Sequence, residues 1–194
     1  CIRDIGVDEV AVRQGLAGTT LVGPGERLQN LTEAVAEYDS ASAVLAPAAY
    51  KLTAGYQGVD TELLPLTLIS IPRDGGNHTV TFGPNAGVTA TTSGTSVSGV
   101  FVLDGADYIV LDGGSGWNVT NTNIAGATAG VWLRQGASND TVRSLTISCG
   151  VDPRTSTLET FGIISSGVAL TNSSDGANND ANTFALNTIT NVQW

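Results

Sequence analysis

Residues 99–113, Gly-Val-Phe-Val-Leu-Asp-Gly-Ala-Asp-Tyr-Ile-Val-Leu-Asp-Gly, consist of two short apolar runs that each end in Asp-Gly. β-Branched and aromatic residues favour strands, and Asp-Gly favours a turn because glycine accepts a positive φ. Both runs are far too short to span a membrane. The stretch therefore predicts two short strands joined by a polar corner.

The first of these runs recurs further along the chain. The segment that starts at Gly99 is echoed at Gly130 and again at Gly162, at intervals of 31 and 32 residues. A second echo links residues 139–147 to residues 181–189, which lie 42 residues later because a polar insertion separates them. Periods of this length indicate a solenoid in which each repeat forms one coil. We therefore predict an all-β fold, a single-stranded right-handed parallel β-helix.

The segment before the repeats has a different character. Gly23-Pro24-Gly25 enforces a turn, and the apolar residues between Leu28 and Tyr38 then follow helical spacing along one face. We expect a short capping helix over about residues 28–38 at the N-terminal end of the solenoid. The predicted division is an N-terminal arm or leading strand over residues 1–15 and a β-helix domain over residues 16–194.

The repeat region carries a family resemblance. Residues 99–113, followed by Asn118–Asn123, resemble the coils of pectin-lyase-like β-helices, most closely those of large secreted surface proteins common in Bacteroidota. The expected helix and the apolar segment 43–50 are similar to the capping helix and first strand that open many such proteins. The resemblance extends from about residue 16 to the end of the sequence, and it implies an extracellular or cell-surface protein.

The charge balance excludes several classes of partner. The chain has 8 Lys and Arg against 18 Asp and Glu, a formal net charge of -10. Nucleic-acid affinity depends on neutralising phosphates with basic side chains, so no nucleic-acid partner is expected. No apolar run approaches the roughly 20 residues of a membrane-spanning helix, so no transmembrane segment is expected.

The two cysteines leave several interpretations open. The chain lacks Met and starts at Cys1, which predicts that a leader has been removed or that the chain is a fragment. Cys1 resembles the lipid-bearing first residue of mature bacterial lipoproteins, which makes it a candidate anchor. Pairing of Cys1 with Cys149 in a disulfide is the alternative.

Asn-x-Ser/Thr sequons, which are typical of exported surfaces, provide candidate glycosylation sites. They lie at Asn30, Asn77, Asn118, Asn139 and Asn172.

Three aspartates are the strongest chemical candidates. Asp104, Asp107 and Asp112 flank adjacent predicted strands and are candidate calcium ligands. The resemblance implies that a lyase would pair such a site with a basic residue, for which Arg134 and Arg143 are the nearby candidates. Aspartate before glycine is, however, ordinary corner chemistry. We therefore expect no metal, no cofactor and no catalytic residue.

Trp132 is the candidate recognition residue. It takes the place of Phe101 in the repeat and alternates with Val131 and Leu133. Because successive strand residues face opposite sides, inward Val131 and Leu133 would turn Trp132 outward. The exposed aromatic ring would then bind a glycan or a protein.

These observations favour a non-enzymatic extracellular scaffold, similar to an adhesin. The pattern reaches the last residues without an evident cap, so we expect self-association into a filament, tube or surface layer, or packing against neighbouring domains of a longer chain. A glycan- or protein-binding module is the first alternative. A polysaccharide lyase or hydrolase is the second.

Overall fold

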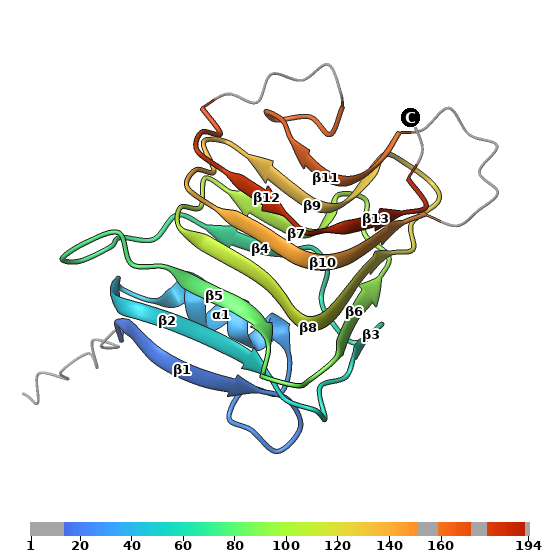
Figure 1. The fold of residues 1–194 in the computed structure, drawn as a ribbon. Coiled ribbons are helices and arrows are strands. Elements are labelled where there is room, and N and C mark those ends of the chain that lie inside the picture. The colour runs from blue at the N-terminus through green and yellow to red at the C-terminus, as the bar shows by residue number, and fades with distance from the viewer. Residues whose placement is uncertain (1–13, 151–158, 172–177, 193–194) are drawn as a thin grey trace, which may run out of the picture.

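The chain winds into a parallel β-solenoid of about five turns (Figure 1). A computed structural model describes residues 14–150, 159–171 and 178–192. Strands account for 51% of the described residues and helix for 6%, and every pairing between named strands is parallel. The predicted all-β parallel β-helix with one short helix near its N-terminal end is confirmed.

Two sheets form the walls of the solenoid. In the larger sheet the strands follow the order β1 (Leu16–Val22), β2 (Val44–Leu52), β5 (Val80–Pro84), β8 (Ile109–Asn121), β10 (Thr141–Cys149) and β12 (Thr183–Ala185). The same sheet contains β3 (Gly58–Val59), β6 (Ala90–Gly94) and β13 (Thr188–Thr190). The smaller sheet contains β4 (Leu66–Ile69), β7 (Gly99–Asp104), β9 (Thr128–Arg134) and β11 (Thr160–Ser165), in that spatial order. The arm predicted over residues 1–15 lies almost entirely outside the described residues.

The sequence repeats coincide with the strand register. Val131 on β9 pairs with Phe101 on β7 and with Ile163 on β11, so the three echoed segments lie directly over one another. The second echo behaves in the same way, because Ile147 on β10 pairs with Ile189 on β13. Each repeat is therefore one coil.

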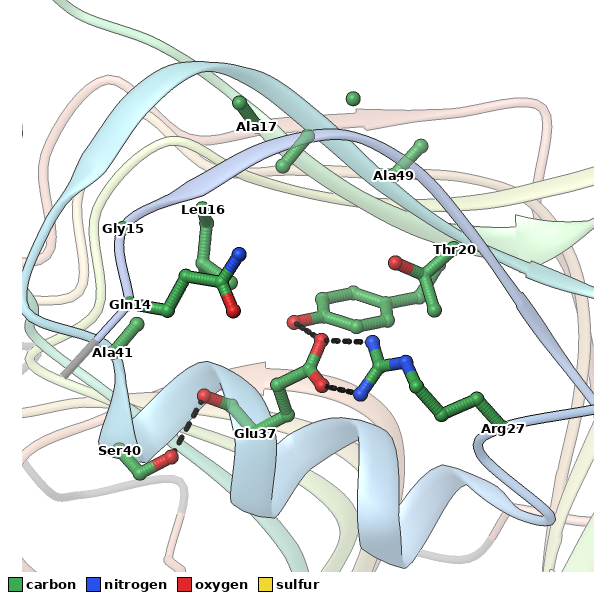
Figure 2. A pocket seen from close by; sticks show the side chains of 13 residues that line it. Gln14, Gly15, Leu16, Ala17, Thr20, Arg27, Glu37, Ser40, Ala41 and Ala49 are labelled. Carbon is green, nitrogen blue, oxygen red and sulfur yellow. Dashed lines mark hydrogen bonds and ion pairs between the residues drawn. The ribbon is translucent and has the colours of Figure 1, made fainter. Parts of the chain in front are cut away.

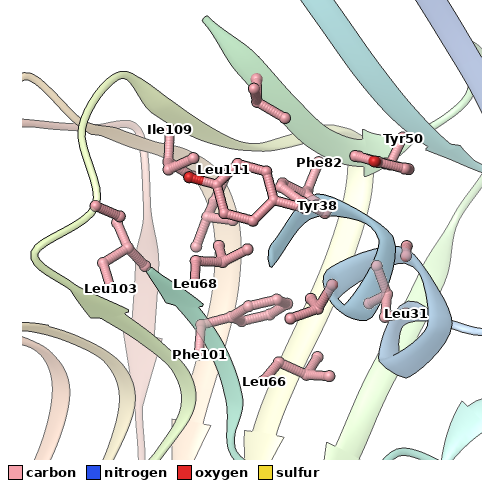
Figure 3. Close-up of a cluster of buried hydrophobic side chains, with 14 of the residues drawn as sticks. Leu31, Tyr38, Tyr50, Leu66, Leu68, Phe82, Phe101, Leu103, Ile109 and Leu111 are labelled. Carbon is pink, nitrogen blue, oxygen red and sulfur yellow. The ribbon is translucent and has the colours of Figure 1, made fainter. Parts of the chain in front are cut away.

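Inward side chains form a continuous apolar column (Figure 3). Phe82, Leu111 and Val142 occupy equivalent positions on β5, β8 and β10, and each is completely buried. The Tyr50 ring extends the column, since it stacks on Phe82 with 4.8 Å between ring centroids. Burial of apolar area is worth about 25 cal/mol per Å², and a coil buries its inner face only when another coil covers it.

The helix α1 (Leu31–Ser40) closes the N-terminal end of the smaller sheet. It begins slightly later than predicted because the Asn30 side chain caps it, accepting a hydrogen bond from the Glu33 amide at 2.9 Å. α1 packs beside β4, where the Tyr38 hydroxyl donates to the Ile69 carbonyl oxygen at 2.8 Å. The Ile69 amide donates to the Asp39 carboxylate at 3.3 Å. The helix thus satisfies backbone groups at the outer edge of β4.

A buried carboxylate from the next coil holds the start of α1. Glu62 is 9% exposed and accepts from the amides of Leu31 and Thr32, at 2.9 and 2.7 Å. It also accepts from the hydroxyls of Thr32 and Tyr56, at 2.6 and 2.7 Å. Free amides and the positive end of the helix dipole make this a favourable place for a negative charge.

The strength of the column is tested by two identical truncations. Val142→Ala removes an inward, fully buried side chain, whereas Val110→Ala removes a half-buried side chain on the outer face of the same sheet. We expect Val142→Ala to lower the free energy of unfolding by about 2 kcal/mol and Val110→Ala to lower it by well under half of that. Urea denaturation followed by circular dichroism measures both, and equal losses would contradict the inward–outward assignment.

Candidate functional site

The three candidate calcium ligands do not converge. Asp104, on β7 of the smaller sheet, accepts a hydrogen bond from Arg134 at 2.8 Å. Asp112, on β8 of the larger sheet, accepts one from Arg143 at 2.8 Å. At Asp107 it is the backbone carbonyl oxygen that binds Arg73. No three acidic, His or Cys side chains gather into a metal-binding group within the described residues.

The two candidate lyase bases are occupied by these aspartates. Partial burial raises the pKa of Asp112, but hydrogen bonds from Arg143 and the Gly114 amide outweigh it, so the net pKa lies below its ordinary value. The same bond raises the pKa of Arg143. A guanidinium stabilised in this way is a poorer proton acceptor, because its neutral form is disfavoured.

The prediction that Trp132 is a surface residue is wrong. Its side chain does point away from the main core, but only 5% of it is exposed. It packs in a separate apolar cluster with Val102 and Ile164, which Leu170 helps to cover. The indole nitrogen donates to the Ser166 hydroxyl at 2.8 Å. The chain that follows β11 therefore covers this part of the outer face, which residue alternation alone does not reveal.

Cys149 is buried, and its sulfur donates to the Phe161 carbonyl oxygen at 3.0 Å. Cys1 lies outside the described residues, so the disulfide and the lipid anchor stay predictions.

The sequons differ in accessibility. Asn77 and Asn139 are exposed, while the Asn30 side chain caps α1 and the half-buried Asn118 donates to Thr91 at 3.5 Å. Asn172 lies outside the described residues.

The C-terminal coil presents an open apolar surface, which we call the terminal coil face and define as Phe184, Leu186 and Ile189. Phe184 and Ile189 pair with the fully buried Val142 and Ile147 of β10, yet they are 47% and 44% exposed. Leu186 is 87% exposed. Among the described residues, nothing covers this end of the apolar column, which lies at the opposite end of the solenoid from β1 (Figure 1).

Two asparagine side chains hold this coil in place. Asn182 accepts from the Asp140 amide and donates to the Ala137 carbonyl oxygen, both at 2.8 Å. Asn187 accepts from the Leu145 amide at 3.0 Å and donates to the Val142 carbonyl oxygen at 2.8 Å. Both amides point back toward the preceding coil. β12 and β13 are thus fixed on one side, while their other edge pairs with no described strand.

Asp140 places a carboxyl group in the interior just before this end. It is 1% exposed, and one oxygen accepts from the Ile109 amide at 2.7 Å while the other has no partner among the described residues. Burial, reinforced by the charge of Asp107, raises the pKa of Asp140 to about 8, despite the opposing effects of the Ile109 amide and Arg73. The group is therefore protonated at neutral pH.

No family model, no curated protein and no solved structure matches this chain. In the part of the chain that the structure describes, no helix has the length and apolar character needed to cross a membrane. The sequence predicts an end without a cap but not that Phe184, Leu186 and Ile189 are its exposed apolar side chains, because exposure at an inward position depends on which coils cover one another.

Truncation of Trp132 distinguishes a packing residue from a recognition residue. We expect Trp132→Ala to lower the free energy of unfolding by about 3 kcal/mol, because it leaves a cavity and removes the partner of Ser166. Thermal and urea unfolding measure the loss. A variant as stable as the parent protein would show that the side chain is not packed as described.

The stability of the protein depends on the ionisation of Asp140. Its pKa is higher in the folded state (about 8) than in the unfolded chain (about 4), so the folded state binds the extra proton between these values. The free energy of unfolding therefore falls as pH rises from about 4 to 8. We expect the free energy of unfolding of Asp140→Asn to lie close to that of the parent protein at pH 4 and to exceed it by up to about 5 kcal/mol at pH 8, since each of the four pH units contributes about 1.4 kcal/mol. A stability difference between Asp140→Asn and the parent protein that does not change with pH would contradict the raised pKa of Asp140.

Proposed function

We propose that this protein is a non-enzymatic scaffold module that acts by self-association through its terminal coil face. The observation that carries the proposal is the uncovered apolar column at Phe184 and Ile189. An apolar surface bordered by an unpaired strand edge readily associates with another chain, because association buries the side chains and satisfies the backbone groups.

A second copy in tail-to-tail orientation is the partner that fits best. The opposite end of the solenoid carries α1 and the charged Arg27–Glu37 pair. That polar end is a poor partner for the apolar terminal coil face. The terminal coil face is instead complementary to itself. Contact of identical surfaces produces a closed two-fold dimer. The two solenoids would then extend in opposite directions from a shared interface.

An extracellular location forms part of the proposal. It is supported by the resemblance of residues 99–113 to pectin-lyase-like coils of secreted surface proteins, and by exposed sequons at Asn77 and Asn139. The non-enzymatic role is supported by Asp104 and Asp112, whose carboxylates bind the two arginines that a lyase mechanism would need.

Charge introduced at the terminal coil face tests the proposal. Ile189→Asp places a carboxylate in the interface, and Thr188→Asp is the matched control because Thr188 is exposed on the outer face of the same strand. We expect light scattering to show a dimer for the parent protein and for Thr188→Asp. For Ile189→Asp we expect the dimer dissociation constant to rise at least about tenfold.

Two outcomes would overturn the proposal. One is a parent protein that stays monomeric up to a concentration of about 1 mM. The other is equal weakening by Ile189→Asp and Thr188→Asp, which would place the contact elsewhere.

A further inference from the structure

A cavity opens at the N-terminal mouth of the solenoid, between β1, β2 and α1 (Figure 2). Its volume is about 500 Å³, which falls within the range of small-molecule sites. Leu16 and Ala48 provide apolar wall, and both are largely buried. The cavity lies at the opposite end of the solenoid from the terminal coil face, so the two surfaces are independent.

A rigid polar network lies in this cavity. Arg27 binds Glu37 through both guanidinium nitrogens, one of them at 2.9 Å from its carboxylate oxygen. The Tyr50 hydroxyl donates to the same carboxylate at 3.2 Å. Tyr50 is 2% exposed and stacks on Phe82, so it fixes Glu37 from the protein interior. The carboxylate is therefore preorganised, which lowers the entropic cost of binding a ligand.

The network is charged but has no net charge. The hydrogen bond from Arg27 lowers the pKa of Glu37, and the same bond raises the pKa of Arg27. Both groups therefore stay ionised at neutral pH and compensate one another. A charged ligand would have to compete with the existing ion pair, whereas a neutral hydroxyl can donate to the carboxylate or accept from the guanidinium without separating them.

Two further polar side chains at the mouth can form hydrogen bonds with a ligand. Among the described residues, neither the Gln14 amide nor the Thr20 hydroxyl has a side-chain hydrogen-bond partner. Figure 2 shows Gln14 and Arg27 on opposite sides of the Glu37 carboxylate. Planar amide, carboxylate and guanidinium groups thus surround one space whose wall is partly apolar.

We propose that this cavity binds a neutral polyhydroxylated ligand of the size of a mono- or disaccharide. Such a molecule presents hydroxyl groups at its rim, which suit Gln14, Arg27 and Glu37, and C–H groups on its ring faces, which suit Leu16 and Ala48. This goes beyond the scaffold role, because it assigns a ligand to the end of the solenoid that self-association leaves free.

The test uses the full chain and a defined panel of sugars. Titration calorimetry is carried out with neutral hexoses, pentoses, deoxyhexoses, N-acetylhexosamines, maltose and cellobiose, and with glucuronate and glucosamine as charged probes. We expect one site per chain with a dissociation constant in the millimolar range or below for at least one neutral sugar. The affinity for glucuronate and for glucosamine should be at least about tenfold weaker than for that neutral sugar.

Variants assign the binding to the cavity. Arg27→Ala should weaken binding at least about tenfold while leaving the unfolding midpoint nearly unchanged, because an exposed ion pair contributes little to stability. Glu37→Gln should weaken binding similarly. Arg143→Ala is the matched control, since Arg143 is also an exposed arginine in an ion pair, in its case with Asp112 outside the cavity. This variant should bind the sugar as the parent protein does.

The proposal is overturned if no neutral sugar of the panel binds with a dissociation constant below about 10 mM, or if Arg27→Ala binds with unchanged affinity. Monomeric Ile189→Asp should still bind sugar. Loss of binding in that variant alone would also overturn the proposal, because it would place the site at the dimer contact instead of the mouth.

Discussion

In-register stacking of inward apolar side chains is the constraint on which the whole solenoid depends. Phe82, Leu111 and Val142 are buried only because each is covered by its equivalents in the coils on both sides. Backbone pairing and side-chain burial therefore require the same register, and a shift of one residue would turn each inward side chain outward. The corners between coils repeat in the same way. A residue with a positive φ precedes each of three successive strands of the larger sheet: Tyr108 (57°), Asn139 (60°) and Ala181 (55°).

The two ends of the solenoid differ because stacking stops there in different ways. At the N-terminal end α1 replaces a strand of the smaller sheet, and Tyr38 and Asp39 bond to the backbone of Ile69. The cavity around Glu37 lies between this helix and the strands β1 and β2. At the C-terminal end β12 and β13 are the last described strands of the larger sheet, and Phe184 and Ile189 on them are 47% and 44% exposed. Both proposed binding surfaces thus lie at the ends of the described solenoid.

Much of the fold could be predicted from the sequence, because the repeat is itself the packing rule. The echo of Gly99 at Gly130 and Gly162 correctly predicts which residues lie over one another. Alternation also predicts that Trp132 faces away from the core, but exposure depends on the later segment that covers it. The cavity residues Arg27, Glu37 and Tyr50 come from three separate elements with no common motif, so no local pattern indicates that they meet. The buried state of Asp140 is equally hidden, since Asn-Asp resembles an ordinary exposed corner.

The position of Glu62 has a consequence for how the molecule assembles. Its carboxylate binds amides that precede it by 31 and 30 residues, and these amides belong to the first turn of α1. A helix of 10 residues is only marginally stable in water by itself, so α1 depends on such contacts. During synthesis the segment 31–40 therefore gains its anchor only after residue 62 has left the ribosome. The N-terminal cap and the second coil then form a single cooperative unit, and the solenoid acquires its first stable layer from two windings at once.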